Sequence, residues 1–105
     1  MTINFPDNLL SYLKNISIAS DIEIVGFIDK NNQFEQKPNI HPDSSNYFLI
    51  NPKEYDNLDN ITLFHSHPNH IELDGFSEWD LENQKWSCLP MLLYSVKHGK
   101  FHYSP

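Results

Sequence analysis

Apolar side chains recur at helical spacing in two parts of the chain. Residues 6–16 (PDNLLSYLKNI) predict an amphipathic helix whose first turn accommodates Pro6. Residues 77–87 (SEWDLENQKWS) predict a second helix, in which Trp79 and Trp86 stand seven positions apart on one face. The apolar stripe of the first helix consists of Leu9, Leu10, Leu13 and Ile16.

Between and after these helices, short apolar runs rich in β-branched and aromatic residues predict strands. The last two are joined through KHG, which has the composition of a hairpin turn. Residues 51–58 (NPKEYDNL) predict a turn and a short helix that starts at Pro52. Helices mixed with hairpin-linked strands indicate an α+β domain with helices packed on a sheet. The predicted strands span residues 22–29, 34–41 (irregular), 47–50, 60–67, 91–96 and 100–104.

Composition narrows the class of protein. The length of 105 residues predicts a single domain over residues 1–105. Because the net charge is −7 and the chain has no arginine and no basic run, we expect no nucleic-acid partner. No apolar run approaches the ~20 residues of a membrane span, so no membrane partner is expected either. The start of the chain lacks a secretory signal pattern, and the single Cys88, expected to be buried or half-buried, fits a reducing cytoplasm.

Residues 64–70 (FHSHPNH) hold three of the six histidines. Since strand side chains alternate, His65 and His67 project to one side and Ser66 to the other. Pro68 ends the strand, so both imidazoles lie near its tip, where Asp80 in the first turn of the next helix can reach them. Two histidines and one carboxylate are the expected ligands of a catalytic zinc, which lowers the pKa of a water in its fourth position to about 7.

The same segment has a second interpretation. Ser77 and Asp80 form an S-x-x-D pattern, which is typical of a helix N-cap. One Asp is not expected to cap a helix and bind zinc at once, so the two interpretations compete and both stay open here. The other histidines are expected in loops or at the surface rather than as ligands, and they are His41, His70, His98 and His102.

Glu23 is the candidate proton carrier. It lies in IEIVGFI, an apolar strand where a carboxylate is out of place unless it is buried for a purpose. Alternation places Glu23 and Val25 on one face, which weakens the competing interpretation of a solvent-facing Glu23 without excluding it. Gly26, three residues on, permits a close backbone approach.

Taken together, these segments resemble the JAMM/MPN (JAB-like) zinc metallopeptidases, whose pattern is E-x-x-G, then H-x-H-P, then S-x-x-D. The corresponding segments here are EIVG (23–26), HSHP (65–68) and SEWD (77–80). Residues 39–55 and 77–96 are similar to the phage tail-assembly branch of that family, and the resemblance covers about residues 5–104. One departure is that eight residues separate Pro68 from Ser77, where the family usually has about six; a longer loop costs little free energy but borders the cleft.

The resemblance implies a fold, a cofactor and a role for each residue. The fold would be a curved mixed β-sheet flanked by helices, in a cytidine-deaminase-like arrangement. His65, His67 and Asp80 would hold Zn²⁺, Glu23 would be the general acid/base, and Ser77 would hydrogen-bond the oxyanion, a role worth roughly 2.7–4 kcal/mol for a single donor.

Three functions follow as hypotheses. The first is a zinc-dependent peptidase or isopeptidase of phage or prophage tail assembly, acting on a protein or peptide such as a tail protein in the cytoplasm of a bacterial host. The second is a JAMM-type protease that clips the C-terminal tail of a ubiquitin-like sulfur-carrier protein. The third is a non-catalytic tail-assembly scaffold, for which an acid/base Glu beside a metal would have no physical purpose.

Overall fold

The computed structural model describes residues 5–56 and 58–105, and it is an α+β domain with one five-stranded sheet and two α-helices. No helix in these two ranges is both long and apolar enough to cross a membrane. The elements are α1 (Asp7–Ile18), β1 (Val25–Ile28), β2 (Phe34–Lys37), the 3-10 helix η1 (Pro52–Tyr55), β3 (Thr62–His67), α2 (Glu78–Ser87), β4 (Met91–Ser95) and β5 (Lys100–Ser104).

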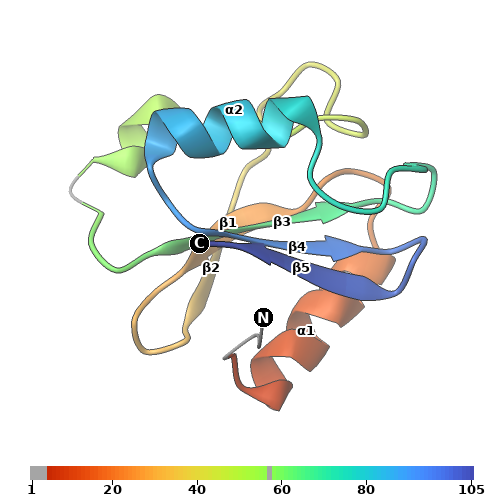
Figure 1. Cartoon of the computed structure of the whole chain (residues 1–105), viewed down its shortest axis with the longest axis horizontal. Helices are drawn as coiled ribbons and strands as arrows, with labels where there is room; N and C mark the ends of the chain where they lie inside the picture. Colours follow the sequence, from red (N-terminus) through yellow and green to blue (C-terminus); the bar gives the residue numbers. More distant parts are fainter. Residues whose placement is uncertain (1–4, 57) are drawn as a thin grey trace.

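The sheet is mixed, with the strand order β2-β1-β3-β4-β5. β1 pairs antiparallel with both β2 and β3, and β4 pairs antiparallel with β5 across a tight turn. β3 and β4 are parallel, and α2 forms the crossover between them. Figure 1 shows α2 over one face of the sheet and α1 against the opposite face. The carboxyl ends of β3 and β4 therefore lie at the same edge of the sheet.

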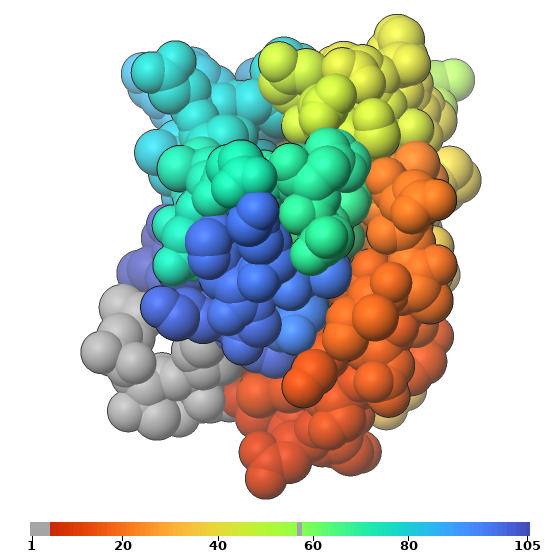
Figure 2. Space-filling view, turned by 90° about the vertical axis from the view of Figure 1, so that its right-hand side faces the viewer, coloured from red at the N-terminus to blue at the C-terminus, as the bar shows by residue number. Residues whose placement is uncertain are grey.

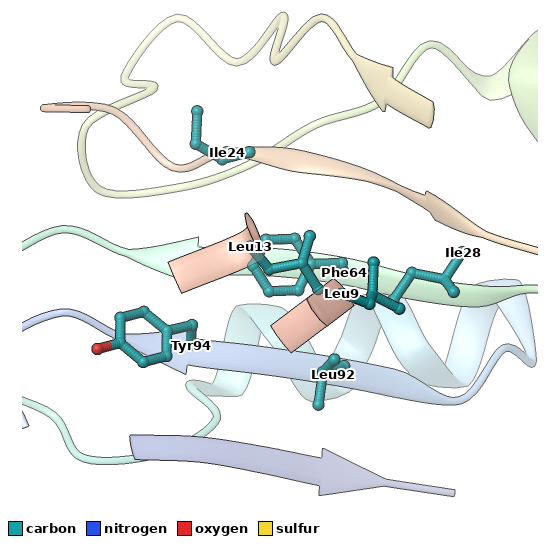
Figure 3. Packing of buried hydrophobic residues seen from close by; sticks show 7 residues of the cluster. All are labelled: Leu9, Leu13, Ile24, Ile28, Phe64, Leu92 and Tyr94. Atoms are coloured by element: carbon teal, nitrogen blue, oxygen red, sulfur yellow. The ribbon is translucent and has the colours of Figure 1, made fainter. Parts of the chain in front are cut away.

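Each face of the sheet has its own apolar cluster, because strand side chains alternate. On the α1 face, Leu9 and Leu13 of the helix pack on strand residues such as Phe64, as Figure 3 shows. The cluster on the α2 face includes Val25, Leu63 and, from β4, Met91. The cluster on the α1 face consists of Leu9, Leu13, Ile24, Ile28, Phe64, Leu92 and Tyr94.

Most predicted elements are confirmed, with shifted ends. The first helix starts at Asp7, directly after Pro6, and continues to Ile18. The last strand has the predicted bounds, whereas the strands predicted over 22–29, 34–41, 60–67 and 91–96 are shorter. The predicted short helix is η1, which starts at Pro52; residue 57 of its predicted range, like residues 1–4 of the predicted domain, lies outside the described residues.

The strand predicted over residues 47–50 is wrong. The segment is extended and apolar, with Phe48 and Ile50 buried, but it joins no strand of the sheet. Its backbone bonds mainly to loop and helix residues: the amide of Asn39 accepts the Leu49 N–H at 3.0 Å and donates to the Tyr47 carbonyl at 3.0 Å. Trp79 Nε1 donates to the Phe48 carbonyl at 2.8 Å, and the Ile40 N–H donates to the Leu49 carbonyl at 2.9 Å. The hydrophobic pattern reported burial correctly, but the hydrogen bonds that a strand would use are made by loop and helix residues.

Cys88 is also not where the sequence suggested. It is exposed, and it ends α2 in the left-handed conformation with φ 59°. Glycine usually occupies such a position, since other residues are strained there. Cys88 therefore belongs to the helix C-cap rather than to the core.

Candidate metal centre

The end of β3 positions the two histidines. His65 lies between Val25 of β1 and Leu93 of β4 in the sheet register, and His67 lies beside Ser95. Both imidazoles are on the α2 face and are buried, at 0% and 2% exposure, with ring centroids 5.4 Å apart. The prediction that these two side chains share one face is confirmed.

The start of α2 brings Asp80 to the same place. Its Oδ2 lies 3.0 Å from His67 Nε2 and 3.2 Å from His65 Nε2. The same Oδ2 accepts the Ser77 N–H at 2.8 Å, and Ser77 Oγ accepts the Asp80 N–H at 3.1 Å, which completes a capping box. Asp80 therefore takes part in the cap and faces both histidines at once, since one carboxylate has lone pairs for both. That the same carboxylate also binds zinc stays a prediction.

Glu23 is the fourth member of this cluster and comes from the segment that precedes β1. It is 1% exposed, so the interpretation of a solvent-facing carboxylate is wrong. Ligand atoms of Glu23, His65, His67 and Asp80 all lie within 4.8 Å of one another. These four buried side chains are close enough to bind one metal ion.

The two carboxylates have opposite pKa shifts. Burial first, and then the charge of Asp80, raise the pKa of Glu23 from 4.5 to about 10. Burial also opposes ionisation of Asp80, but the interaction with His65 and the hydrogen bonds from His67 and from the Ser77 N–H outweigh it and hold the Asp80 pKa below its usual value. At neutral pH the chain alone therefore has an ionised Asp80 beside a protonated Glu23.

Unpaired buried atoms in the cluster support metal binding. Glu23 Oε1 and His65 Nε2 are buried and make no hydrogen bond within the described chain, although nearly all buried polar atoms in proteins do. His65 Nε2 is near Asp80 Oδ2, but it is not aligned for a hydrogen bond with it. Imidazole nitrogens together with carboxylate oxygens are a usual donor set for a divalent transition metal.

A surface cleft of about 360 Å³ reaches the cluster at His67 and Ser77. Tyr47 forms part of one wall, and Ile71, Glu72 and Leu73 of the loop after Pro68 form another. Figure 2 views the edge of the sheet where the loop around residue 47 (yellow-green), the loop after Pro68 (green) and the start of α2 (cyan) meet. The long loop between Pro68 and Ser77 therefore does border the cleft, as the sequence suggested.

The remaining histidines lie outside the cluster, as expected. His70 is exposed and bonds to Asn46, while His98 and His102 bond to the loop after Pro68, at the Glu72 carbonyl and the Asp74 carboxylate. His41 stacks on Tyr47 at a centroid distance of 5.0 Å.

Two residues near the cluster were missed by the sequence analysis. Ser66 Oγ accepts the Ile24 N–H at 2.9 Å, which binds the residue after Glu23 to β3. Asn39 donates to the Glu23 carbonyl at 3.0 Å. Ser66 could have been found from its place between the two histidines, whereas Asn39, in a loop 16 residues after Glu23, gave no signal.

Comparison with known proteins does not add an assignment. No family model matches this chain, and no curated protein matches it either. The geometry of the four-residue cluster is therefore the observation on which a functional conclusion can be built.

Proposed function

We propose that this chain is a zinc-dependent peptidase or isopeptidase of the JAMM/MPN type. The single observation that carries the proposal is the buried cluster of Glu23, His65, His67 and Asp80 within 4.8 Å. A protein gains no stability from collecting two carboxylates and two imidazoles in its interior unless they are paired or hold a cation. The mixed sheet with a helix on each face is compatible with a JAB/MPN fold.

The three proposed zinc ligands have distinct supports. His65 and His67 come from successive positions of β3 on the α2 face, and the Ser77 N–H of the capping box aims the Asp80 carboxylate at both Nε2 atoms. Two histidines with one carboxylate leave a fourth position open, as catalytic zinc sites do. Zinc bound there would supply a Lewis acid that polarises a carbonyl and acidifies water.

Glu23 and Ser77 are the proposed reacting groups of the chain. A carboxylate whose pKa is raised by burial and by the charge of Asp80 is suited to take a proton and return it to a leaving amine. A cation held by the other three residues would offset the charge of Asp80 and so lower the Glu23 pKa. Ser77 accepts a bond through Oγ but keeps a hydroxyl proton, which it can donate to an oxyanion at the cleft.

The proposed substrate is a protein or peptide, because the cluster opens onto a surface cleft rather than an enclosed cavity. A role in phage tail assembly is supported by the sequence resemblance of residues 39–55 and 77–96 alone. The same site chemistry would serve to clip the tail of a sulfur-carrier protein, so the substrate has to be decided by experiment.

Metal content tests the site. Purified protein is expected to hold one zinc per chain by elemental analysis, and Asp80→Ala is expected to hold none. Asp7→Ala is the matched control, since Asp7 is likewise an acidic residue in the first turn of a helix but is exposed and far from the cluster in sequence. Absence of zinc from the wild-type protein after reconstitution would refute the proposal.

Turnover tests the reaction. The zinc-loaded protein is incubated with a fluorescence-quenched peptide library, a sulfur-carrier protein with a Gly-Gly tail, and phage tail proteins. We expect cleavage that is lost in Glu23→Gln while zinc remains bound. Cleavage of the Gly-Gly tail would favour the sulfur-carrier function, and zinc binding without cleavage of any of the three would favour a non-catalytic module.

A further inference from the structure

The side chain of Asn39 makes five hydrogen bonds to the backbone. Its Nδ2 donates to the carbonyls of Glu23 at 3.0 Å, Ser44 at 3.3 Å and Tyr47 at 3.0 Å. Its Oδ1 accepts the N–H groups of two further residues in the same loop, His41 at 3.1 Å and Leu49 at 3.0 Å. Since Nδ2 carries two hydrogens, one of its N–H groups is shared between two of the three carbonyls, and the half-buried amide uses its whole hydrogen-bonding capacity on one loop and on Glu23.

The backbone of Glu23 is held by this loop rather than by the sheet. Its N–H donates to the Ser44 carbonyl at 2.8 Å, and its carbonyl accepts from Asn39. Glu23 precedes β1, which begins at Val25, and its own N–H and carbonyl make no bond to a strand of the sheet. The next residue is joined to β3, because the Ser66 N–H donates to the Ile24 carbonyl at 3.0 Å. On the other side, the Ile24 N–H is bound by Ser66 Oγ.

The histidines and Asp80 are positioned by other elements. His65 and His67 are held by β1 and β4, and Asp80 is held by the cap of α2. The distance from Glu23 to the other three residues therefore depends on two attachments, the Ser66 bonds to Ile24 on one side and the bonds that Asn39 makes or supports on the other.

We propose that Asn39 is a positioning residue, which holds Glu23 at the metal centre without contacting the metal or the substrate. Because Asn39 also binds the Tyr47 carbonyl, it joins the cleft wall and the proton carrier into one unit. A substrate that displaced Tyr47 would therefore strain the Asn39 bond to the Glu23 carbonyl. This inference rests on the proposed function for its consequence in catalysis, but its structural content can be tested alone.

Two variants and one matched control separate the possibilities. Asn39→Asp keeps the acceptor oxygen and loses the donors, and Asn39→Ala loses both. Asn51→Asp is the control, because it adds the same charge at an amide that only accepts the Lys53 N–H at the start of η1. If Asn39→Asp and Asn39→Ala have the same effect and Asn51→Asp has none, the effect comes from the lost Nδ2 donors and not from the added charge.

The first measurement needs neither metal nor substrate. The Glu23 N–H donates to the Ser44 carbonyl, which Asn39 Nδ2 also binds. Because both Asn39 variants lose that support, hydrogen exchange of the Glu23 amide is expected to accelerate by about tenfold or more, while the amides of β3 keep their protection. Unchanged exchange at Glu23 would overturn the inference, whatever the protein does as an enzyme.

The second set of measurements distinguishes positioning from support of the fold. Zinc content is expected to be unchanged, and the visible spectrum of the Co²⁺-loaded protein is expected to change as it does in Glu23→Gln. On the library peptide that the wild type cleaves best, kcat is expected to fall by about 10–100-fold with KM little changed. A wild-type Co²⁺ spectrum or a wild-type kcat in Asn39→Ala would overturn the inference. Failure of the wild type to cleave any peptide would refute the proposed function. The exchange and spectral results would then decide whether Asn39 positions Glu23.

Discussion

Replacement of Glu23 by Gln tests the electrostatics of the cluster without any substrate. Glu23 is buried beside an ionised Asp80, and its pKa is raised from 4.5 to about 10. The native chain without metal therefore retains a proton that the unfolded chain has lost over this range of pH. Since the native state then binds more protons than the unfolded state, the free energy of unfolding falls as pH rises from 4.5 toward 10.

The magnitude follows from the size of that window. Each pH unit inside it changes the free energy of unfolding by about 1.36 kcal/mol, so raising the pH from about 5 to about 8 removes about 4 kcal/mol. This is a large part of the roughly 5–15 kcal/mol that stabilises an ordinary domain. Glutamine stays neutral at every pH, so Glu23→Gln is expected to lack this loss and to be the more stable of the two chains at high pH.

Urea unfolding of the chelated proteins at several pH values provides the assay. The difference between the wild type and Glu23→Gln reports Glu23 together with its coupling to Asp80, because the titrating groups remote from this pair behave alike in both chains. With saturating Zn²⁺ we expect the wild type to lose its extra pH dependence, since a cation stabilises the ionised carboxylate. Parallel stability curves for the two chelated proteins would refute the assignment of Glu23 as a buried, protonated carboxyl.

Two further predictions concern the residues that hold Glu23 in place. Ser66→Ala leaves the buried Ile24 N–H without a partner, so it is expected to lower the free energy of unfolding, measured by urea titration, by about 1–3 kcal/mol. Ser17→Ala removes an equally buried hydroxyl whose bond lies within its own helix, and it should cost less. Gly26→Ala places a Cβ against the backbone of β2 and the ring of Phe34 and is expected to cost about 1–3 kcal/mol, so an unchanged Tm in calorimetry would contradict this packing.

The cluster of Glu23, His65, His67 and Asp80 was predictable because each of its members follows from a local rule. Alternation along a strand placed His65 and His67 together, and an out-of-place charge in an apolar run marked Glu23. The close approach predicted at Gly26 is confirmed, since a neighbouring backbone leaves no room for a side chain there. These inferences use only the few residues around each position, because the hydrophobic pattern of a segment reports which way its own side chains face.

What the sequence did not reveal depends on contacts between distant segments. The apolar run at residues 47–50 has the pattern of a strand, but its backbone bonds to Asn39, Trp79 and the Ile40 N–H instead of to the sheet. The partner of the Ile24 N–H is Ser66, which lies 42 positions away. Such pairs require knowledge of which elements are neighbours, and the strand order is not encoded in the period of any one segment.

Asp80 shows why a capping pattern and a ligand pattern can coincide. The N-terminus of a helix carries partial positive charge and unpaired N–H groups, so a carboxylate at the third helical position is stabilised in its ionised form. In this chain the Ser77 N–H binds Asp80 Oδ2, and the same oxygen faces the Nε2 atoms of His65 and His67. The cap thus fixes the rotamer of the side chain and favours the charge state that a metal ligand must have. The Ser77 backbone N–H is therefore the group that aims the carboxylate at the strand tip, and loss of this bond should weaken the proposed metal binding even when every proposed ligand is retained.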